Sequence, residues 1–317
     1  MDKKYKITKL TDHDKWNKFE SKSPQSSIFS SSESLLTFAE NLDLYEISKG
    51  EETKCLIYLY QENNNVTSLP LIYSGILFQS QNNQKNSRYL AEKFKLTEMM
   101  VNNILNQYNS LDINLHYNVE DIRPFIWYNY HEKNLPKFNV DVRYTSIINL
   151  KNKSLGDLLK SFDDVKQRDI KKVLKNEDYK IDFNFDLETL KRLYLKTMKK
   201  NNPDFFDKNL ENNMKFLYKI NENGKAFQTN LIFQDKVIYC NLFSYHNKTA
   251  CYLFGAGDTD VNERLGGTYS LWKSVEKCHE KKLDYIDLEG VNSPQRGSFK
   301  INFGGDLTSY YKLNLNK

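Results

Sequence analysis

Residues Cys251–Phe303, CYLFGAGDTDVNERLGGTYSLWKSVEKCHEKKLDYIDLEGVNSPQRGSFKINF, carry the pattern around which the chain is organised. They predict, in order, a strand over 251–256, a loop containing Arg264-Leu265-Gly266-Gly267-Thr268, a helix over 269–281, a strand over 283–289 and a long polar loop. Two strands that are joined through one helix lie parallel, with a right-handed crossover. We therefore expect the start of the helix and the ends of both strands to meet at one edge of a sheet.

The loop before this helix has features of a phosphate site. The first N–H groups of a helix lack partners within the helix and carry partial positive charge, so they suit an anion. Gly266 and Gly267 would let a ligand approach the backbone closely, and Arg264 would add a charged donor. A Gly-Gly pair before a helix also occurs as a plain turn, and that alternative stays open.

Composition limits the kind of protein. A chain of 317 residues with 21 Tyr and 19 Phe predicts two domains with aromatic-rich cores. The net charge of +5 is spread along the chain, which favours anionic small molecules over a DNA duplex and leaves RNA open. The cysteines form no CxxC and the histidines no HxxxH pair, so we expect no metal site, and reduced thiols in a cytoplasmic protein. The start MDKKYKITKL has no apolar segment, and no apolar run reaches about 18 residues, so neither a secretory signal nor a membrane span is expected.

The two halves of the chain predict different element orders. In residues 1–150 we expect helices and strands with a sheet of their own, including strands over 42–48, 54–60, 111–116, 125–130 and 142–150 and a helix over 87–108. From residue 151 on we expect helices over 155–161, 164–176, 187–200 and 208–220, and then an antiparallel meander over 226–233, 237–245 and 249–256. Within the second of these helices Arg168, Lys172 and Lys175 share one face, which is either a solvated face or a surface for a phosphate-rich substrate.

A meander followed by a glycine loop, a helix and a parallel strand resembles the acyl-CoA-binding part of GNAT-fold acyltransferases. The tail narrows this, because Tyr285–Gly290 (YIDLEG) and Gly297–Gly305 (GSFKINFGG) are similar to the "fDlgG…gsfKrgFGg" ending of the FemABX-like branch. Trp16–Phe29, Pro70–Gly75 and Gln167–Lys172 are similar to weaker motifs of the same branch. The resemblance implies an α+β fold of tandem GNAT-like domains with mixed, mostly antiparallel sheets flanked by helices. It also implies a domain over 1–150 with an acceptor or structural role, and a domain over 151–317 with the acyl-CoA site.

The resemblance leaves the donor to be decided. Fem-type ligases transfer an amino acid from aminoacyl-tRNA to a peptidoglycan precursor, whereas relatives in polysaccharide biosynthesis transfer an acyl group from coenzyme A to a nucleotide-linked deoxyamino sugar. Glu263–Thr268 is similar to a degenerate (Q/R)xxGx(G/A) pyrophosphate loop, which the tRNA-dependent members generally lack. We therefore expect acyl-CoA, held by Arg264, Leu265, Gly266, Gly267, Thr268 and Gly255. The tRNA-dependent ligase and a non-catalytic, degenerate binding module remain alternatives.

Amide formation needs a base for the amine and a group that stabilises the tetrahedral intermediate. Glu289 and Asp287 are the candidate bases, since they lie two apart on one predicted strand; Asp287 alternatively caps the following loop. The FemABX-like branch has a glycine at the position of Glu289, so the role of Glu289 rests on its chemistry alone. Lys300 matches the lysine that the resemblance implicates in stabilising the intermediate, and Phe299 matches its aromatic neighbour. The alternative is that Phe299 only packs against its neighbours and that the charge of Lys300 is only solvated.

Further candidates concern the acceptor. Tyr252, Asn292, Arg296 and Phe299 are candidates for the sugar or its diphosphate, and Tyr73 and Arg168 fall within weaker motifs. The sequence indicates neither the acyl group, nor the sugar, nor the oligomeric state.

Overall fold

The computed structural model describes residues 4–81, 84–207, 209–261 and 263–316, which form two compact units. The first unit comprises Met1–Arg143 together with Ser309–Lys317, and the second comprises Tyr144–Thr308. The sequence places the division at 150/151 and assigns the last residues to the second domain. Residues 309–317 instead join the first unit, because β13 (Asp306–Asn316) pairs with β6 (Ser110–Asn114), with Leu313 opposite Ile113.

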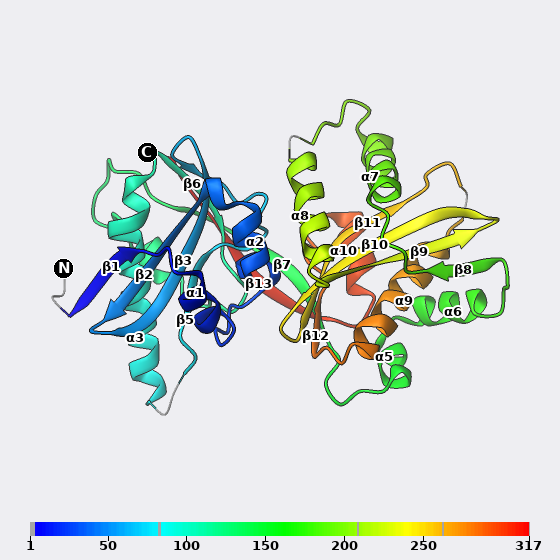
Figure 1. Ribbon diagram of the computed structural model, residues 1–317, viewed down its shortest axis with the longest axis horizontal. Coiled ribbons are helices and arrows are strands. Elements are labelled where there is room, and N and C mark those ends of the chain that lie inside the picture. Colours follow the sequence, from blue (N-terminus) through cyan, green and yellow to red (C-terminus); the bar gives the residue numbers. More distant parts are fainter. Residues whose placement is uncertain (1–3, 82–83, 208, 262, 317) are drawn as a thin grey trace. The chain divides into compact units, whose positions relative to one another are not determined.

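The sheet of the first unit is mostly antiparallel (Figure 1). Its strand order is β1-β2-β3-β4-β6-β13, and β5 pairs with β3. The parallel pair is β4 with β6, whereas β2 and β3 form a hairpin. The further strands of this sheet are β1 (Tyr5–Lys9), β2 (Leu42–Lys49), β3 (Glu52–Glu62), β4 (Asn65–Val66) and β5 (Gly75–Phe78).

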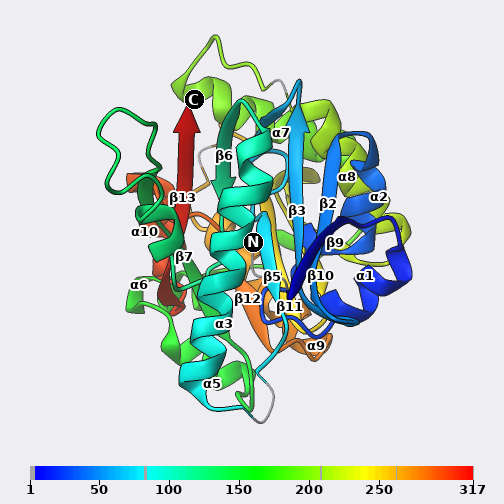
Figure 2. The same ribbon diagram turned by 90° about the vertical axis from the view of Figure 1, so that its left-hand side faces the viewer.

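One long helix covers a face of this sheet. Figure 2 shows α3 (Asn86–Met99) in front of the strands of the first unit. It continues as a π turn, Met100–Ile104, and a 3-10 turn, Leu105–Gln107, which together bury an apolar stripe against β3 and β6. The shorter helices are α1 (His13–Glu20), α2 (Ser32–Thr37) and α4 (Arg123–Ile126).

The predicted strand over 125–130 is wrong. Pro124 lies in the first turn of α4, where its fixed φ favours a helix and its missing N–H leaves no bond unmade. The N–H groups of Ile126 and Trp127 bind the carbonyls of Ile122 and Arg123, so the segment turns instead of extending. Its apolar residues therefore form a helical turn whose Phe125 is buried.

The sheet of the second unit has the strand order β7-β12-β11-β10-β9-β8. The predicted meander is confirmed, since β9, β10 and β11 pair antiparallel. β12 is confirmed as parallel to β11, with α9 (Gly266–Glu280) as the crossover between them. The strands are β7 (Asn139–Asn149), β8 (Tyr179–Asp182), β9 (Ala226–Phe233), β10 (Lys236–His246), β11 (Thr249–Gly257) and β12 (Tyr285–Asp287).

Six helices belong to the described part of the second unit: α5 (Leu155–Ser161), α6 (Asp164–Val173), α7 (Leu187–Asn201), α8 (Leu210–Glu222), α9 and α10 (Pro294–Ile301). The first residue of the helix expected over 208–220 lies outside the described ranges. α9 begins at Gly266, three residues before the predicted start, so both glycines belong to its first turn.

The long polar loop expected after β12 is corrected by α10. Pro294 starts this helix, and the N–H of Gly297 donates to the carbonyl of Ser293 at 2.7 Å. Gly297 is needed there because a Cβ would lie 2.3 Å from the carbonyl oxygen of Val291. Phe299 and Lys300 therefore project from a helix and not from a loop. Within the described ranges, none of the helices has both the length and the apolar character that crossing a membrane requires.

Candidate active site

β11 and β12 separate at the edge where the predicted site residues gather. Their parallel ladder ends with Cys251 opposite Asp287, and β11 then continues to Gly257 without β12 beside it. The chain turns sharply after β12, since Glu289 has φ 55°, in the left-handed region that residues with a side chain rarely adopt. Oδ1 of Asp287 accepts the backbone N–H of Glu289 at 2.7 Å and also the hydroxyl of Thr145. Asp287 therefore shapes this turn, in keeping with the capping alternative.

Glu289 and Lys300 form a charge pair beside this turn. Burial, with a smaller contribution from the charge of Asp287, raises the pKa of Glu289 to about 7, against the opposing charges of Lys300 and Arg296. Burial also lowers the pKa of Lys300, against the effect of the two carboxylates. The Nζ of Lys300 lies 3.4 Å from the carbonyl oxygen of Gly290 and 5.1 Å from the centre of the Tyr252 ring. A carboxylate that titrates near neutrality can accept a proton from an amine, and an ammonium group beside it can stabilise an oxyanion.

The hydroxyl of Tyr252 belongs to a buried network. It donates to Oδ1 of Asn241 at 2.7 Å, and Nδ2 of Asn241 donates to the hydroxyl of Ser270 at 2.6 Å. This network joins β11, β10 and α9. Gly255 leaves room for it, since a Cβ there would lie 1.7 Å from the Tyr252 hydroxyl. The side chain of Tyr252 thus contributes its ring to the surroundings of Lys300, while its hydroxyl is engaged within the unit.

The start of α9 is capped by a carboxylate of the chain itself. Glu263 accepts the N–H of Leu265 at 2.9 Å, the N–H of Gly266, and the hydroxyl of Tyr179 at 2.8 Å. A Cβ on Gly266 would lie 2.6 Å from Oε2 of Glu263 and 2.9 Å from the ring of Tyr239. The close approach that this glycine permits is therefore made by the protein's own side chains.

Asn292 and Arg296 follow β12, and their surroundings differ. Oδ1 of Asn292 accepts the N–H of Tyr144 at 2.7 Å, and its Nδ2 donates to the Tyr144 carbonyl at 3.0 Å, so it ties this segment to β7. Arg296 is exposed on α10, yet its charge lowers the pKa of Glu289. Arg296 therefore lies within electrostatic reach of the carboxylate–ammonium pair.

Two other predicted cations are exposed. Arg264 lies on the loop before α9 with its side chain in solvent. Arg168 is exposed on α6, where its Nε lies 3.3 Å from the carbonyl oxygen of Asp164 one turn earlier.

Tyr73 belongs to the core of the first unit. Its side chain is 1% exposed, and its ring meets those of Phe29, Tyr117 and Tyr310 edge to face. Its surroundings are thus those of a packed aromatic residue.

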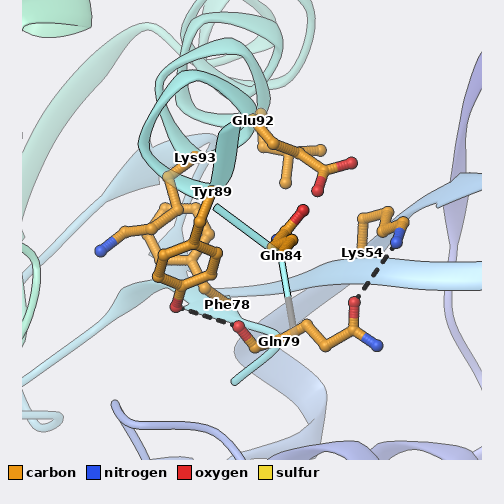
Figure 3. A pocket seen from close by; sticks show the side chains of 8 residues that line it. Lys54, Phe78, Gln79, Gln84, Tyr89, Glu92 and Lys93 are labelled. Carbon is orange, nitrogen blue, oxygen red and sulfur yellow. Dashed lines mark hydrogen bonds between the residues drawn. The ribbon is translucent and has the colours of Figure 1, made fainter. Parts of the chain in front are cut away.

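A polar recess also lies in the first unit (Figure 3). Three of its polar residues bind one another: the hydroxyl of Tyr89 donates to the Gln79 carbonyl at 3.1 Å, and Nζ of Lys54 lies 3.4 Å from Oε1 of Gln79. The recess contains none of the residues that the sequence predicts for the site. Its lining residues are Lys54, Phe78, Gln79, Gln84, Tyr89, Glu92, Lys93 and Leu96.

Comparison with known proteins rests on structure, because no protein-family model and no curated protein matches the sequence. The structure is similar to FemX, with a TM-score of 0.63 and 11% identity over 96% of each chain. It is also similar to a tandem GNAT protein from the clavulanic acid biosynthesis pathway, with a TM-score of 0.53 and 9% identity over 99% of each chain. A GNAT-family acetyltransferase from Colwellia psychrerythraea matches with a TM-score of 0.50 and 11% identity over 98% of each chain. The chain has a tandem GNAT-like fold.

In the second unit of this tandem GNAT-like fold, a lysine that the sequence pattern does not single out lies beside two of the predicted site residues, Thr268 and Phe299. Nζ of Lys166 donates to the hydroxyl of Thr268 at 3.0 Å and lies 4.3 Å from the centre of the Phe299 ring. Burial lowers the pKa of this ammonium group. The sequence does contain a pattern that indicates Lys166. It precedes the buried Ile170 and Val173 by four and seven positions, and so lies on the inward face of α6. This pattern is easily overlooked, because the exposed cations of the same helix are more numerous.

In the described part of the chain, no group of three or more His, Cys, Asp or Glu side chains is arranged to hold an ion. Where β11 and β12 separate, the structure places carboxylates, an ammonium group and backbone groups.

Proposed function

We propose that the chain is an N-acyltransferase that uses Glu289 and Lys300. The observation that carries this proposal is a carboxylate with a pKa of about 7 beside a half-buried ammonium group, where two parallel strands separate. The amine nitrogen of the acceptor attacks the carbonyl carbon of the donor, and a C–N bond forms. Glu289 takes the proton that the amine loses, and Lys300 stabilises the negative oxygen of the tetrahedral intermediate. The carrier leaves when its bond to the carbonyl carbon breaks, as a thiol in the case of coenzyme A.

The donor and acceptor that we favour are acyl-CoA and a nucleotide-linked deoxyamino sugar, in the cytoplasm. Support comes from the glycine pair in the first turn of α9, the exposed Arg264 beside it and the GNAT-like fold. Arg264 and the N–H groups of Gly267 and Thr268 would bind the pyrophosphate. Arg296, within electrostatic reach of Glu289, would meet the diphosphate of the sugar nucleotide.

A second candidate is an aminoacyl-tRNA-dependent ligase that acts on a peptidoglycan precursor. It is favoured by the carboxylate of Glu263, which takes two N–H groups that a pyrophosphate would otherwise bind. The exposed cations Arg168, Lys171 and Lys172 of α6, with Lys175 just after the helix, would suit the phosphates of an RNA.

A product assay tests the proposal. The protein is incubated with acetyl-CoA or a longer acyl-CoA and a panel of nucleotide-linked amino sugars, and in parallel with charged tRNA and a peptidoglycan precursor. The N-acylated product is measured by mass spectrometry, with the Lys300→Ala variant as control. We expect product from the coenzyme A arm, strongly reduced in the variant. Product only from the tRNA arm, lost on RNase treatment, would favour the second candidate. Absence of product and of ligand binding in both arms would point to a non-catalytic binding module.

A further inference from the structure

The carboxylate of Glu263 occupies the position where a donor phosphate would meet α9. Both of its oxygens are used: Oε1 accepts the Tyr179 hydroxyl and the N–H of Leu265, and Oε2 accepts the N–H of Gly266. We propose that Glu263 determines donor selectivity, because a diphosphate-bearing donor can bind the N–H groups of Leu265 and Gly266 only after this carboxylate has been displaced. This inference rests on the proposed function, in that α9 borders the acyl-donor site.

The bonding around Glu263 explains why its displacement is unfavourable. Charge-assisted hydrogen bonds from backbone N–H groups to a carboxylate are stronger than those between neutral groups, and the helix start adds a favourable interaction with negative charge. A phosphate would compete for the same N–H groups and would also be repelled by the carboxylate. The Tyr179 hydroxyl, which comes from β8, fixes the carboxylate from a third side.

Packing around Gly266 closes the space between the carboxylate and the helix. The Cβ position of Gly266 lies 2.6 Å from Oε2 of Glu263, 2.7 Å from a methyl carbon of Leu231 and 2.9 Å from the Tyr239 ring. An anion therefore has no room beside Gly266 while Glu263 is in place. The contacts with Glu263, Leu231 and Tyr239 are therefore enough to require glycine at this position, whether or not a ligand binds there.

Two cations near the start of α9 would make its local charge positive once the carboxylate of Glu263 has moved away. Lys166 already reaches the first turn of the helix through the hydroxyl of Thr268, at 3.0 Å, and Arg264 is exposed on the adjoining loop. Once the carboxylate has left, positive charge remains at this helix start, from the N–H groups of Leu265 and Gly266 and from these two cations. The same helix start would then bind a diphosphate.

Calorimetric titration of the full chain with coenzyme A, and separately with inorganic pyrophosphate, tests the proposal. We expect Glu263→Ala to bind both ligands about tenfold more tightly than the wild type or better, a change of about 1.4 kcal/mol. Glu280→Ala is the matched control, because Glu280 lies at the other end of α9, paired with Lys277 at 3.0 Å; it should bind like the wild type. Equal Kd values for the wild type and Glu263→Ala, or weaker binding by Glu263→Ala, would overturn the proposal.

A second variant tests the proposal if Glu263→Ala does not fold. A separate measurement, the yield of N-acyl product, distinguishes failure of this inference from failure of the proposed function. If thermal unfolding shows that Glu263→Ala is not folded, Glu263→Gln keeps an acceptor for the N–H groups but lacks the charge, and it should bind pyrophosphate more tightly than the wild type. An unchanged Kd in Glu263→Gln would then overturn the proposal. Failure of the proposed function would instead appear as absence of N-acyl product with every donor, which the titration does not measure.

Discussion

The side chain of Asp287 accepts the backbone N–H of Glu289 at 2.7 Å, and through this bond it holds Glu289 in a left-handed conformation, at φ 55°. The negative charge of Asp287 also raises the pKa of Glu289. One residue thus fixes the turn at the carboxylate that we propose as the base and adds to the effect of burial, which is the main cause of its raised pKa.

Replacing Asp287 by Asn separates these two effects. Asn keeps an acceptor for the Glu289 N–H but removes a negative charge, so the pKa of Glu289 should fall. We expect the acidic limb of the kcat/KM–pH profile to move to lower pH in Asp287→Asn. Asp287→Ala, which has no acceptor, should lose activity across the whole pH range. A limb that stays in place in the Asn variant would contradict the electrostatic part of the account.

Glu289 should also make stability depend on pH. Its pKa is about 7 in the folded chain and about 4.3 in the unfolded chain, so between these values the folded state holds a proton that the unfolded state has released. The free energy of unfolding contributed by this group therefore falls as pH rises from about 4.3 to about 7. We expect the Tm of Glu289→Gln, relative to the wild type, to be higher at pH 8 than at pH 4. The exposed Glu280→Gln should show no such trend, and an equal offset for Glu289→Gln at both pH values would refute the burial of its charge.

Gly255 should tolerate no side chain. An added Cβ would lie 1.7 Å from the hydroxyl of Tyr252, so Gly255→Ala must shift that ring and disturb its bond to Asn241. We expect a loss of about 1 to 3 kcal/mol in the free energy of unfolding, measured by denaturant titration. Gly156→Ala is a control, because Gly156 lies in α5 and its Cβ would meet only the Ser154 hydroxyl, at 3.6 Å. That substitution should be neutral or stabilising by up to about 1 kcal/mol. Similar stabilities for both variants would show that the Tyr252 contact is unimportant.

Lys166 should affect donor binding more than turnover. Its half-buried ammonium group donates to the Thr268 hydroxyl, and it has further N–H groups to offer an anionic donor. We expect Lys166→Met to raise the KM of the donor about tenfold and to change kcat by less than about threefold, because charge-assisted bonds to the donor are lost. Lys166→Arg, which keeps the charge and the contact with Phe299, should recover most of the affinity. A purely structural role would give the opposite result, with kcat and Tm lowered in both variants and the KM unchanged.

The sequence predicts the second unit better than the first. The meander and the parallel β12 follow from alternating apolar residues and from a helix of the right length between two strands, which are local signals. The segment after Ile122 resembles a strand because its apolar residues outweigh the helix-starting effect of Pro124. The segment after Ser293 resembles a loop because Gly297 and Ser298 are turn residues, whereas Gly297 is needed to pass the backbone at Val291.

The candidate site is predictable in its residue types and not in its contacts. Glu289 and Lys300 stand out by charge among turn-forming neighbours, and the structure brings their charges together. The bond from Leu265 to Glu263 is local, but Tyr179, which binds the same carboxylate, lies 84 positions away along the chain. Such distant partners depend on the packing of β8 against β9, which no local pattern specifies.

The most direct test of the central claim is the rate of amide formation, measured in single turnovers across pH 5–9 for the wild type and Glu289→Gln with whichever donor yields product. We predict an acidic limb near the pKa of about 7 in the wild type. In Glu289→Gln we predict a rate lower by about 10²- to 10⁴-fold without that limb. An unchanged rate and an unchanged limb in Glu289→Gln would contradict the assignment of Glu289 as the base.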